Sequence, residues 1–275
     1  MSASSSPGLS RRRAAVLGAP IAHSLSPSLH RAAYRHLGLD WQYEAIEVTA
    51  EQVVDFVTRC GPEWVGLSLT MPLKEAVLPA LAQMTPTVAL SNSANTVVFG
   101  EAGPMGHNTD VTGFINALSE HHIVRVESAA ILGSGATARS ALLALQQLGA
   151  SEVTLVGRMG DSLPRCVALA QELGLRVAVH PWEEAIGAIG AIEAPLVINT
   201  APASAGARLS EQLPAPVGLL FEVLYDPRPT PLADAWARRG GQVIGGLDLL
   251  VHQAVEQVLR MTGQRVSAEV LRQAL

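Results

Sequence analysis

Two short stretches near the start of the chain each bring polar side chains close together. Ser24 and Ser26 place two hydroxyls two residues apart, before a predicted helix. Thr70 and Lys74 place a hydroxyl and an ammonium four residues apart, after a predicted strand. Serine also caps helices, and a single lysine is commonly a solvated charge. Lys74, however, begins a predicted helix, where the dipole disfavours a cation that has no other role.

A third stretch supplies an amide and a carboxylate. Asn95 begins a predicted strand, and Asp110 follows Asn108 and Thr109 before a predicted helix, for which it is also an ordinary cap. Together with the hydroxyls and the ammonium, these groups suit a small acid that carries several hydroxyls better than an apolar ligand.

A glycine-rich turn in the second half of the chain has the form of a dinucleotide-binding fingerprint. The predicted strand at residues 129–132 leads through Gly133 and Gly135 to Ala138 and a predicted helix. In this G-x-G-x-x-A pattern the first glycine makes the tight turn and the second lets the backbone approach a pyrophosphate. Free N–H groups at the helix start then face the phosphates. The alternative is a turn that binds nothing.

The strand after that helix predicts which dinucleotide binds. It ends in Gly157 and Arg158, without the carboxylate that usually holds the ribose hydroxyls of NAD. A guanidinium forms forked, charge-assisted hydrogen bonds with a 2′-phosphate. The sequence therefore favours NADP over NAD, and a solvated surface arginine is the alternative interpretation.

Strand-like and helix-like segments alternate along the chain, which predicts an α/β protein with mostly parallel sheets. Before residue 110, the patterns predict strands at 14–17, 41–48, 65–69 and 95–99 and helices at 26–37 and 51–59. After it, they predict strands at 129–132, 153–156, 176–179, 196–199, 217–223 and 242–244 and helices at 138–148, 164–173, 231–239 and 249–261.

We expect this α/β chain to form two domains after a disordered tail at residues 1–13. A boundary fits near residue 110, after a polar, glycine-rich loop, and a hinge fits at Gly245 and Gly246. The prediction is an α/β substrate-binding catalytic domain at 14–110 plus 247–275, and a Rossmann-type doubly wound dinucleotide-binding domain at 111–246. The C-terminal helix is expected to pack back on the first domain.

Composition narrows the class of function. The chain has 275 residues, of which 48% are apolar and 16% charged, so it can bury a large core. Lysine and arginine number 19 against 24 aspartates and glutamates, and the net charge of −5 disfavours nucleic-acid binding. Cys60 and Cys166 are far apart, and the eight histidines form no HExxH motif, so we predict no metal site and a cytoplasmic location. No segment matches a membrane span or a secretion signal.

Five separated motifs resemble those of shikimate dehydrogenases. They are residues 18–27 (GAPIAHSLSP) with His30, 70–74 (TMPLK), 94–96 (ANT), 108–110 (NTD) and 249–254 (LLVHQA). They follow the family's order and spacing over nearly the whole chain. The family reduces 3-dehydroshikimate to shikimate with NADPH, on the route to aromatic amino acids, so the resemblance implies that activity here.

The resemblance also implies a role for individual residues. Lys74 and Asp110 correspond to the catalytic pair, in which the ammonium donates a proton to the developing alkoxide and the carboxylate holds it in place. The implied substrate-binding residues are Ser24, Ser26, Thr70, Lys74, Asn95, Asp110, Tyr225 and Gln253. The implied NADP-binding residues are Gly133, Ser134, Gly135, Ala136, Thr137, Arg158, Val223 and Gly246.

The chain departs from the family's pattern at a few positions. Ser68 stands where the family often has asparagine, and Glu222 replaces a common aspartate. Gly157 and Met159 flank Arg158 where two polar residues are usual, which leaves the arginine but removes its neighbours.

Two alternative functions remain open. One is a quinate/shikimate dehydrogenase that uses NAD or both cofactors, against which the two serines and Arg158 argue. The other is a non-catalytic sensor of a dinucleotide or metabolite, which would have lost Lys74 or Asp110, whereas both are present. We expect a small-molecule substrate, no nucleic-acid or membrane partner, and a monomer or homodimer.

Overall fold

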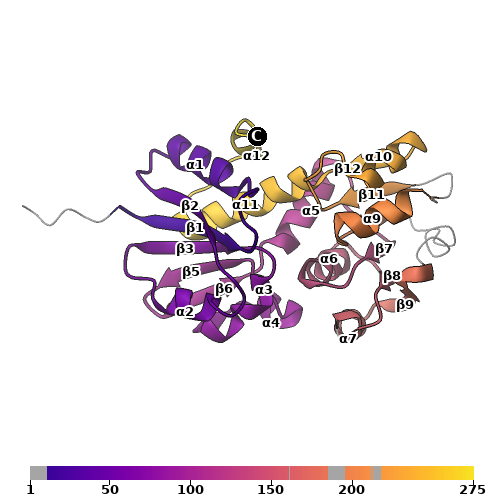
Figure 1. Ribbon diagram of the computed structural model, residues 1–275, viewed down its shortest axis with the longest axis horizontal. Coiled ribbons are helices and arrows are strands. Elements are labelled where there is room, and N and C mark those ends of the chain that lie inside the picture. Colours follow the sequence, from indigo (N-terminus) through magenta and orange to yellow (C-terminus); the bar gives the residue numbers. More distant parts are fainter. Residues whose placement is uncertain (1–10, 161, 185–195, 212, 214–217) are drawn as a thin grey trace, which may run out of the picture. The chain divides into compact units, whose positions relative to one another are not determined.

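The computed structural model describes every residue except 1–10, 161, 185–195, 212 and 214–217. The chain forms two compact units (Figure 1). Unit 1 comprises the described residues up to Val88, Ser93–His107 and Gln257–Leu275, and unit 2 comprises Ala89–Asn92 and the described part of Asn108–Glu256. Most of the predicted tail lies outside the described residues. Its predicted end at residue 13 is wrong, because Arg13 is the first residue of a strand that pairs on both sides.

Unit 1 is built on a six-stranded mixed sheet with the order β2-β1-β3-β5-β6-β4. Its strands are β1 Arg13–Gly18, β2 Gln42–Glu47, β3 Trp64–Leu69, β4 Gln83–Met84, β5 Thr96–Gly100 and β6 Gly103–His107. β1 runs parallel to β2 and β3, whereas β5 is antiparallel to both β3 and β6. The strand β6 lies where the sequence analysis expected a loop. Its sequence, GPMGH, has no β-branched residue and so lacks the side-chain pattern of a strand, although it pairs with β5 over all five residues.

Short helices cover the sheet of unit 1. They are α1 Ser26–His36, α2 Val53–Thr58, α3 Leu73–Ala76, the 3-10 helix η1 Leu78–Ala80, and α12 Ala268–Arg272. Two further helices, α4 Pro86–Ser91 and α11 Gly246–Thr262, begin in one unit and end in the other. The end of α11 packs on β3, where a Cβ on Gly66 would lie 2.8 Å from Cγ of Met261. The end of the last long helix, from Gln257 on, therefore packs on unit 1 as predicted, whereas its residues up to Glu256 belong to unit 2.

Unit 2 contains a six-stranded parallel sheet with the order β12-β11-β10-β7-β8-β9. Its strands are β7 Ser128–Leu132, β8 Glu152–Gly157, β9 Arg176–Pro181, β10 Leu196–Asn199, β11 Leu219–Glu222 and β12 Gln242–Ile244. The strand order changes direction between β7 and β10, as it does in the doubly wound Rossmann fold. Val217, the first residue of one predicted strand, lies outside the described residues.

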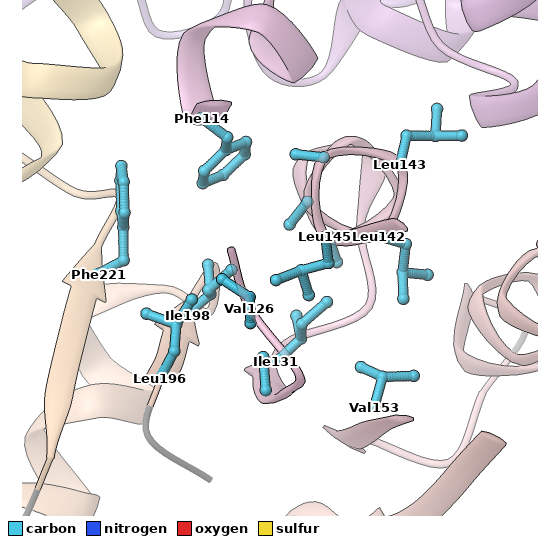
Figure 2. Close-up of a cluster of buried hydrophobic side chains, with 14 of the residues drawn as sticks. Phe114, Val126, Ile131, Leu142, Leu143, Leu145, Val153, Leu196, Ile198 and Phe221 are labelled. Carbon is cyan, nitrogen blue, oxygen red and sulfur yellow. The ribbon is translucent and has the colours of Figure 1, made fainter. Parts of the chain in front are cut away.

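Helices pack on both faces of this parallel sheet. They are α5 Asp110–Glu120, α6 Ala136–Gln147, α7 Ser162–Glu172, the 3-10 helix η2 Trp182–Glu184, α9 Ala203–Ser210 and α10 Pro231–Arg238. Alternate residues of β7 point to opposite faces. Ile131 joins a core with α5, α6 and α7, and Leu132 joins a second core with α9 and α10. Figure 2 shows the first core, in which the rings of Phe114 and Phe221 lie 5.1 Å apart.

Within the described residues, no helix is long and apolar enough to cross a membrane. Apolar residues of the short strands β1, β3, β7, β8 and β10 lie instead in buried clusters.

Candidate active site

The predicted substrate-binding residues of unit 1 lie in segments that leave the sheet at one edge. β1 and β3 run parallel, so the segments after Gly18 and Leu69 begin at the same edge. β5 is antiparallel to β3 and pairs Thr96 with Ser68, so Asn95, just before β5, lies at that edge as well. The residues that the topology places there are Ser24, Ser26, Thr70, Lys74 and Asn95.

Backbone hydrogen bonds hold the segments after β1 and β3 against each other. The N–H of Ala19 donates to the carbonyl oxygen of Met71 at 3.2 Å, and the N–H of Thr70 donates to that of Leu17 at 3.0 Å. A Cβ on Gly18 would lie 2.5 Å from Cγ2 of Thr70, so this approach requires glycine. The half-buried Thr70 is therefore held at the end of β1.

Among the residues that the structure describes, no side chain caps the start of α1, so neither serine has that role. The N-cap residue of α1 is Leu25, so the alternative interpretation of Ser26 as a helix cap is wrong. The helical backbone of Leu25 places Ser26 inside the first turn, beyond the position from which a side chain caps. Ser24 Oγ instead accepts a hydrogen bond from the N–H of Ser26 at 3.3 Å.

Lys74 lies in the short helix α3 and is half-buried. Its carbonyl oxygen accepts a hydrogen bond from the N–H of Ala94 at 2.8 Å. This bond joins the lysine's segment directly to the residue before Asn95. The backbones of two predicted site residues, 21 positions apart in the chain, are thus held side by side.

Asn95 is 2% exposed and is held by its neighbours on both sides. Its carbonyl oxygen accepts hydrogen bonds from the N–H of Leu69 at 2.7 Å and from Nε2 of Gln257 at 3.3 Å. Its side-chain Oδ1 accepts a hydrogen bond from Oγ1 of Thr96 at 2.9 Å. Strand β3 and helix α11 therefore both fix its position.

His30 of the first motif is a buried structural residue. Its ring stacks on Tyr43 with the centroids 4.0 Å apart, and its Nε2 lies 3.1 Å from Oε1 of Gln257. Burial lowers the pKa of His30 to about 4, although the hydrogen bond to Gln257 acts in the opposite direction. The imidazole is therefore neutral at pH 7 and does not serve as a cation.

In unit 2, a buried polar cluster positions the start of α5. Nδ2 of Asn108 donates to Oγ of Ser91 and to Oγ of Ser140, both at 3.0 Å. Its Oδ1 accepts from the N–H of Asp110 at 3.2 Å. Asp110 is the first helical residue and not the cap, which is Thr109. Asp110 is 5% exposed, and its carboxylate lies in the first helical turn, where the dipole favours a negative charge.

The glycine-rich turn lies between β7 and α6. Gly133 has φ +106°, and a Cβ there would lie 2.4 Å from Oγ1 of Thr200, so both the backbone and the space require glycine. Gly135 is the exposed N-cap of α6, and a Cβ there would meet nothing within 4 Å. Among the residues that the structure describes, no side chain caps α6, so N–H groups of its first turn have no capping partner there. This arrangement fits the phosphates of a dinucleotide.

Arg158 follows β8, which pairs in parallel with β7, so it leaves the sheet at the same edge as the glycine-rich turn. Its side chain is exposed and makes no hydrogen bond or ion pair with the residues that the structure describes. Ser134, in the glycine-rich turn, contacts the helix that follows Arg158: its Oγ is 2.7 Å from Oγ of Ser162 at the start of α7.

The remaining predicted residues lie after β11 and in α11. A Cβ on Gly246 would lie 2.4 Å from the carbonyl oxygen of Val223, so these two residues are in close contact. Tyr225 is half-buried. Gln253 is 7% exposed, and its Nε2 donates to the carbonyl oxygen of Leu250 at 2.8 Å.

Glu222, at the end of β11, has a structural role. Its two carboxylate oxygens accept hydrogen bonds from Nδ2 of Asn199 at 3.0 and 2.9 Å. It also accepts from Oγ1 of Thr230 at 2.8 Å and from the N–H of Leu224 at 3.1 Å. Burial raises the pKa of Glu222, and these hydrogen bonds oppose that shift.

Sequence analysis missed two residues that organise the site. Asn108 was seen only as part of a motif, and the structure shows that it holds the backbone of Asp110. Gln257 was not singled out, and it contacts His30 and the residues around Asn95. Its position four residues after Gln253, on the same face of a helix, is the signal that points to it.

Among the described residues, no group of three or more His, Cys, Asp or Glu side chains could hold a metal ion. The polar side chains of the predicted site residues are hydroxyls and amides, together with the charged groups of Lys74, Asp110 and Arg158.

Family models match both ends of the chain. The shikimate dehydrogenase substrate binding domain matches residues 16–97, and the shikimate 5′-dehydrogenase C-terminal domain matches residues 246–275. Among curated relatives, the shikimate dehydrogenase (NADP(+)) of Crocosphaera subtropica is 32% identical, with 94% of each chain covered. That of Synechococcus sp. (strain JA-3-3Ab) is 35% identical over 94% of this chain and 91% of the relative.

Solved structures agree with these matches. The shikimate dehydrogenase of Mycobacterium tuberculosis is 41% identical with a TM-score of 0.87, covering 96% of this chain and 98% of that one. The shikimate 5-dehydrogenase of Thermus thermophilus, in complex with NADP(H) and shikimate, is 32% identical with a TM-score of 0.79, covering 96% and 100%. Identity above 30% over nearly the full length of both chains shows that this protein belongs to the shikimate dehydrogenase family.

Proposed function

We propose that this protein is an NADP-dependent shikimate dehydrogenase, which reduces 3-dehydroshikimate to shikimate reversibly on the route to aromatic amino acids. The observation that carries the proposal is its membership of the family over about 94% of the chain, with relatives named as the NADP(+) enzyme. The Thermus relative binds NADP(H) and shikimate together. The motifs of the family, including Lys74 and Asp110, are present here.

Lys74 and Asp110 act as the catalytic pair in this proposal. NADPH, when bound, supplies the hydride for the ring ketone. Lys74 donates a proton to the oxygen on which negative charge develops, because an ammonium both gives a proton and stabilises an anion. The carboxylate of the buried Asp110 is the partner of Lys74 in the reaction. The side chain of Asn108 holds the backbone N–H of Asp110.

The substrate's hydroxyls and carboxylate are assigned to the hydroxyl and amide side chains. The edge of the unit 1 sheet contributes Ser24, Ser26, Thr70 and Asn95. Unit 2 contributes Tyr225 and Gln253. Such groups match a polyhydroxylated acid, because each ring hydroxyl both donates and accepts hydrogen bonds.

NADP is assigned to the glycine-rich turn and its neighbours in unit 2. Gly133, Ser134, Gly135, Ala136 and Thr137 would hold the pyrophosphate at the start of α6, where Gly135 leaves open space. Arg158 would pair with the 2′-phosphate, and its exposed side chain supports that role. Val223 and Gly246, which touch each other, would lie beside the nicotinamide.

The domain roles follow from these assignments. We assign residues 14–110 with 247–275 to substrate binding and catalysis, and residues 111–246 to NADP. The compact units of the structure divide after His107 and after Glu256, and the short segment Ala89–Asn92 also belongs to unit 2. We also propose a cytoplasmic enzyme, monomeric or homodimeric, without nucleic-acid or membrane partners.

Steady-state kinetics with four pairs of reactants test this proposal. Shikimate and quinate are each oxidised with NADP+ and with NAD+, and kcat/KM is compared. We expect shikimate with NADP+ to give the highest value. A higher value with quinate or with NAD+ would identify the quinate/shikimate dehydrogenase instead, and no turnover with any pair would favour a sensor.

A further inference from the structure

We propose that Gln257 is a positioning residue that sets the orientation of the Asn95 side-chain amide toward the substrate. This inference rests on the proposed function, in which Asn95 binds a ring hydroxyl. Gln257 lies near the end of α11 and is 2% exposed. It connects Asn95 and Thr96 on one side with Ser68 and His30 on the other.

The direction of this network is set by one backbone carbonyl. Nε2 of Gln257 lies 3.3 Å from the carbonyl oxygen of Asn95, and a carbonyl oxygen can only accept. The Gln257 side chain must therefore turn its NH₂ group toward Asn95 and its Oε1 away from it.

The hydroxyl of Thr96 links the orientation of the Gln257 amide to that of the Asn95 side chain. Nε2 of Gln257 also donates to Oγ1 of Thr96, at 3.0 Å. The Thr96 hydroxyl therefore accepts from Gln257 and is left to donate its own proton to Oδ1 of Asn95, at 2.9 Å. Because Oδ1 is bound at Thr96, the other end of the amide, Nδ2, is the end directed away from Thr96. The end of the Asn95 side-chain amide that faces away from Thr96 is thus the donor Nδ2, and not the acceptor Oδ1.

The other end of Gln257 receives only donors. Ser68 Oγ donates to Oε1 at 2.8 Å, and the Tyr43 hydroxyl donates in turn to Ser68 Oγ at 2.6 Å. His30 donates to the same Oε1 through Nε2, which must therefore carry the ring proton. Rotation of the Gln257 amide by 180° would turn Oε1 toward the carbonyl oxygen of Asn95, and two acceptors do not form a hydrogen bond, so this contact fixes the orientation.

Burial strengthens the effect of Gln257 on the orientation of the Asn95 amide. Asn95, Thr96 and Gln257 are each 2% exposed or less, so water does not readily replace a lost partner. Without the donor from Gln257, the Thr96 hydroxyl is free to turn, and the Asn95 amide can adopt both orientations. A substrate hydroxyl then meets a donor in only part of the population, which weakens binding.

The test is the variant Gln257→Met, which keeps the length of the side chain but removes the amide. We expect KM for shikimate to rise by about 5- to 10-fold, the range of one lost neutral hydrogen bond. KM for NADP+ should change by less than about twofold, because the network lies within unit 1. The exposed Gln264→Met, also near the C-terminus, is the matched control and should keep wild-type kinetics.

Tyr43→Phe separates positioning from stability. It removes a hydrogen bond from the same network on the side away from Asn95, and Ser68 can still donate to Gln257. We expect Tm to fall by a few degrees while KM for shikimate stays within about twofold of wild type. If Gln257→Met does not fold, Thr96→Val removes the hydroxyl bound to Asn95 and carries the same expectation of a raised KM.

The outcomes distinguish this inference from the proposed function. An active wild-type enzyme whose KM for shikimate is unchanged in Gln257→Met, or raised equally in Tyr43→Phe, overturns the positioning role alone. A wild-type chain that does not oxidise shikimate with NADP+ overturns the proposed function, and the inference with it.

Discussion

At the scale of the residue, the account depends most on Lys74, which is also the only lysine in the chain. We expect Lys74→Ala to lower kcat for 3-dehydroshikimate reduction by about 10²- to 10⁴-fold, because a positioned general acid is lost. NADPH binding, measured by the fluorescence of the bound cofactor, should remain nearly intact.

Lys74→Arg is the matched control for charge. It keeps a positive charge, but a guanidinium does not release a proton near pH 7. We expect its kcat to stay as low as that of Lys74→Ala, while KM for shikimate stays closer to wild type. Wild-type turnover in either variant would contradict the role of Lys74 as the acid.

Arg158 carries the second prediction at this scale. Arg158→Ala should raise KM for NADP+ by about 10- to 100-fold, since a charge-assisted hydrogen bond contributes about 1.5–3 kcal/mol. KM for NAD+, which lacks the 2′-phosphate, should change by less than about threefold. Arg238→Ala removes a surface arginine that pairs with Asp234 on α10, and serves as the control. Equal shifts for both cofactors in Arg158→Ala would show that Arg158 does not read the 2′-phosphate.

Several residues of the site were predictable because their chemistry is local. Gly133 needs a positive φ, and the pattern of the turn shows this in the sequence. The capping of α1 was not predictable, because it depends on whether the helix begins one residue earlier or later. The role of Gln257 depends on contacts with residues more than 150 positions away, which no local pattern contains.

At the scale of the element, the turn between β7 and α6 gives a prediction that separates folding from binding. Gly133→Ala should destabilise unit 2 by at least about 1–3 kcal/mol, because alanine disfavours φ +106° and its Cβ would collide with Thr200. Gly135→Ala should cost at most about 1 kcal/mol, because its φ of −80° suits alanine and its Cβ meets open space.

Gly135→Ala should instead affect the binding of the cofactor. If phosphates lie at the start of α6, the new Cβ of Gly135→Ala occupies part of their space, and KM for NADPH should rise by about tenfold. Thermal unfolding and steady-state kinetics check both expectations. A Gly135→Ala enzyme with wild-type KM for NADPH would place the pyrophosphate elsewhere.

Elements with a strong side-chain pattern were predicted well, and others were not. The buried parallel strands β7, β8 and β10 read as apolar runs, because both faces of their sheet are covered. The helix α9 and the strand β6 were missed. α9, of sequence ASAGARLS, contains glycine and two serines, and β6 contains two glycines and a proline, so their side chains do not specify them.

At the scale of the whole molecule, the buried His30 makes stability depend on pH. Its pKa is about 4 in the folded protein and about 6.5 when unfolded. As pH falls from 6.5 to 4, the unfolded chain binds a proton that the folded chain does not, so the free energy of unfolding falls. This histidine alone should contribute a loss of about 3 kcal/mol over that range, at about 1.4 kcal/mol per pKa unit.

Urea unfolding at pH 7 and at pH 4 checks this expectation. In His30→Gln the loss between the two pH values should be about 3 kcal/mol smaller than in wild type. His36→Gln, at an exposed position on the same helix, should keep the wild-type dependence. The same pH dependence in all three proteins would mean that His30 is not buried in its neutral form.

The two-unit α/β architecture was predictable from alternating segments, a fingerprint turn and a late helix that returns to the first unit. The exact residues at which the two units divide were less predictable. The division after His107 lies close to the boundary predicted near residue 110, but the division after Glu256 lies within the helix α11 and not at the predicted hinge of Gly245 and Gly246. Contact between distant segments decides such a boundary, and composition does not reveal it.

The most direct test of the central claim is the reduction reaction itself. Purified protein is mixed with NADPH and a limiting amount of 3-dehydroshikimate, and the loss of NADPH absorbance and the product are both measured. The account predicts that one NADPH is consumed for each 3-dehydroshikimate and that shikimate is formed. No loss of NADPH with the wild-type protein, or loss without shikimate, would contradict it.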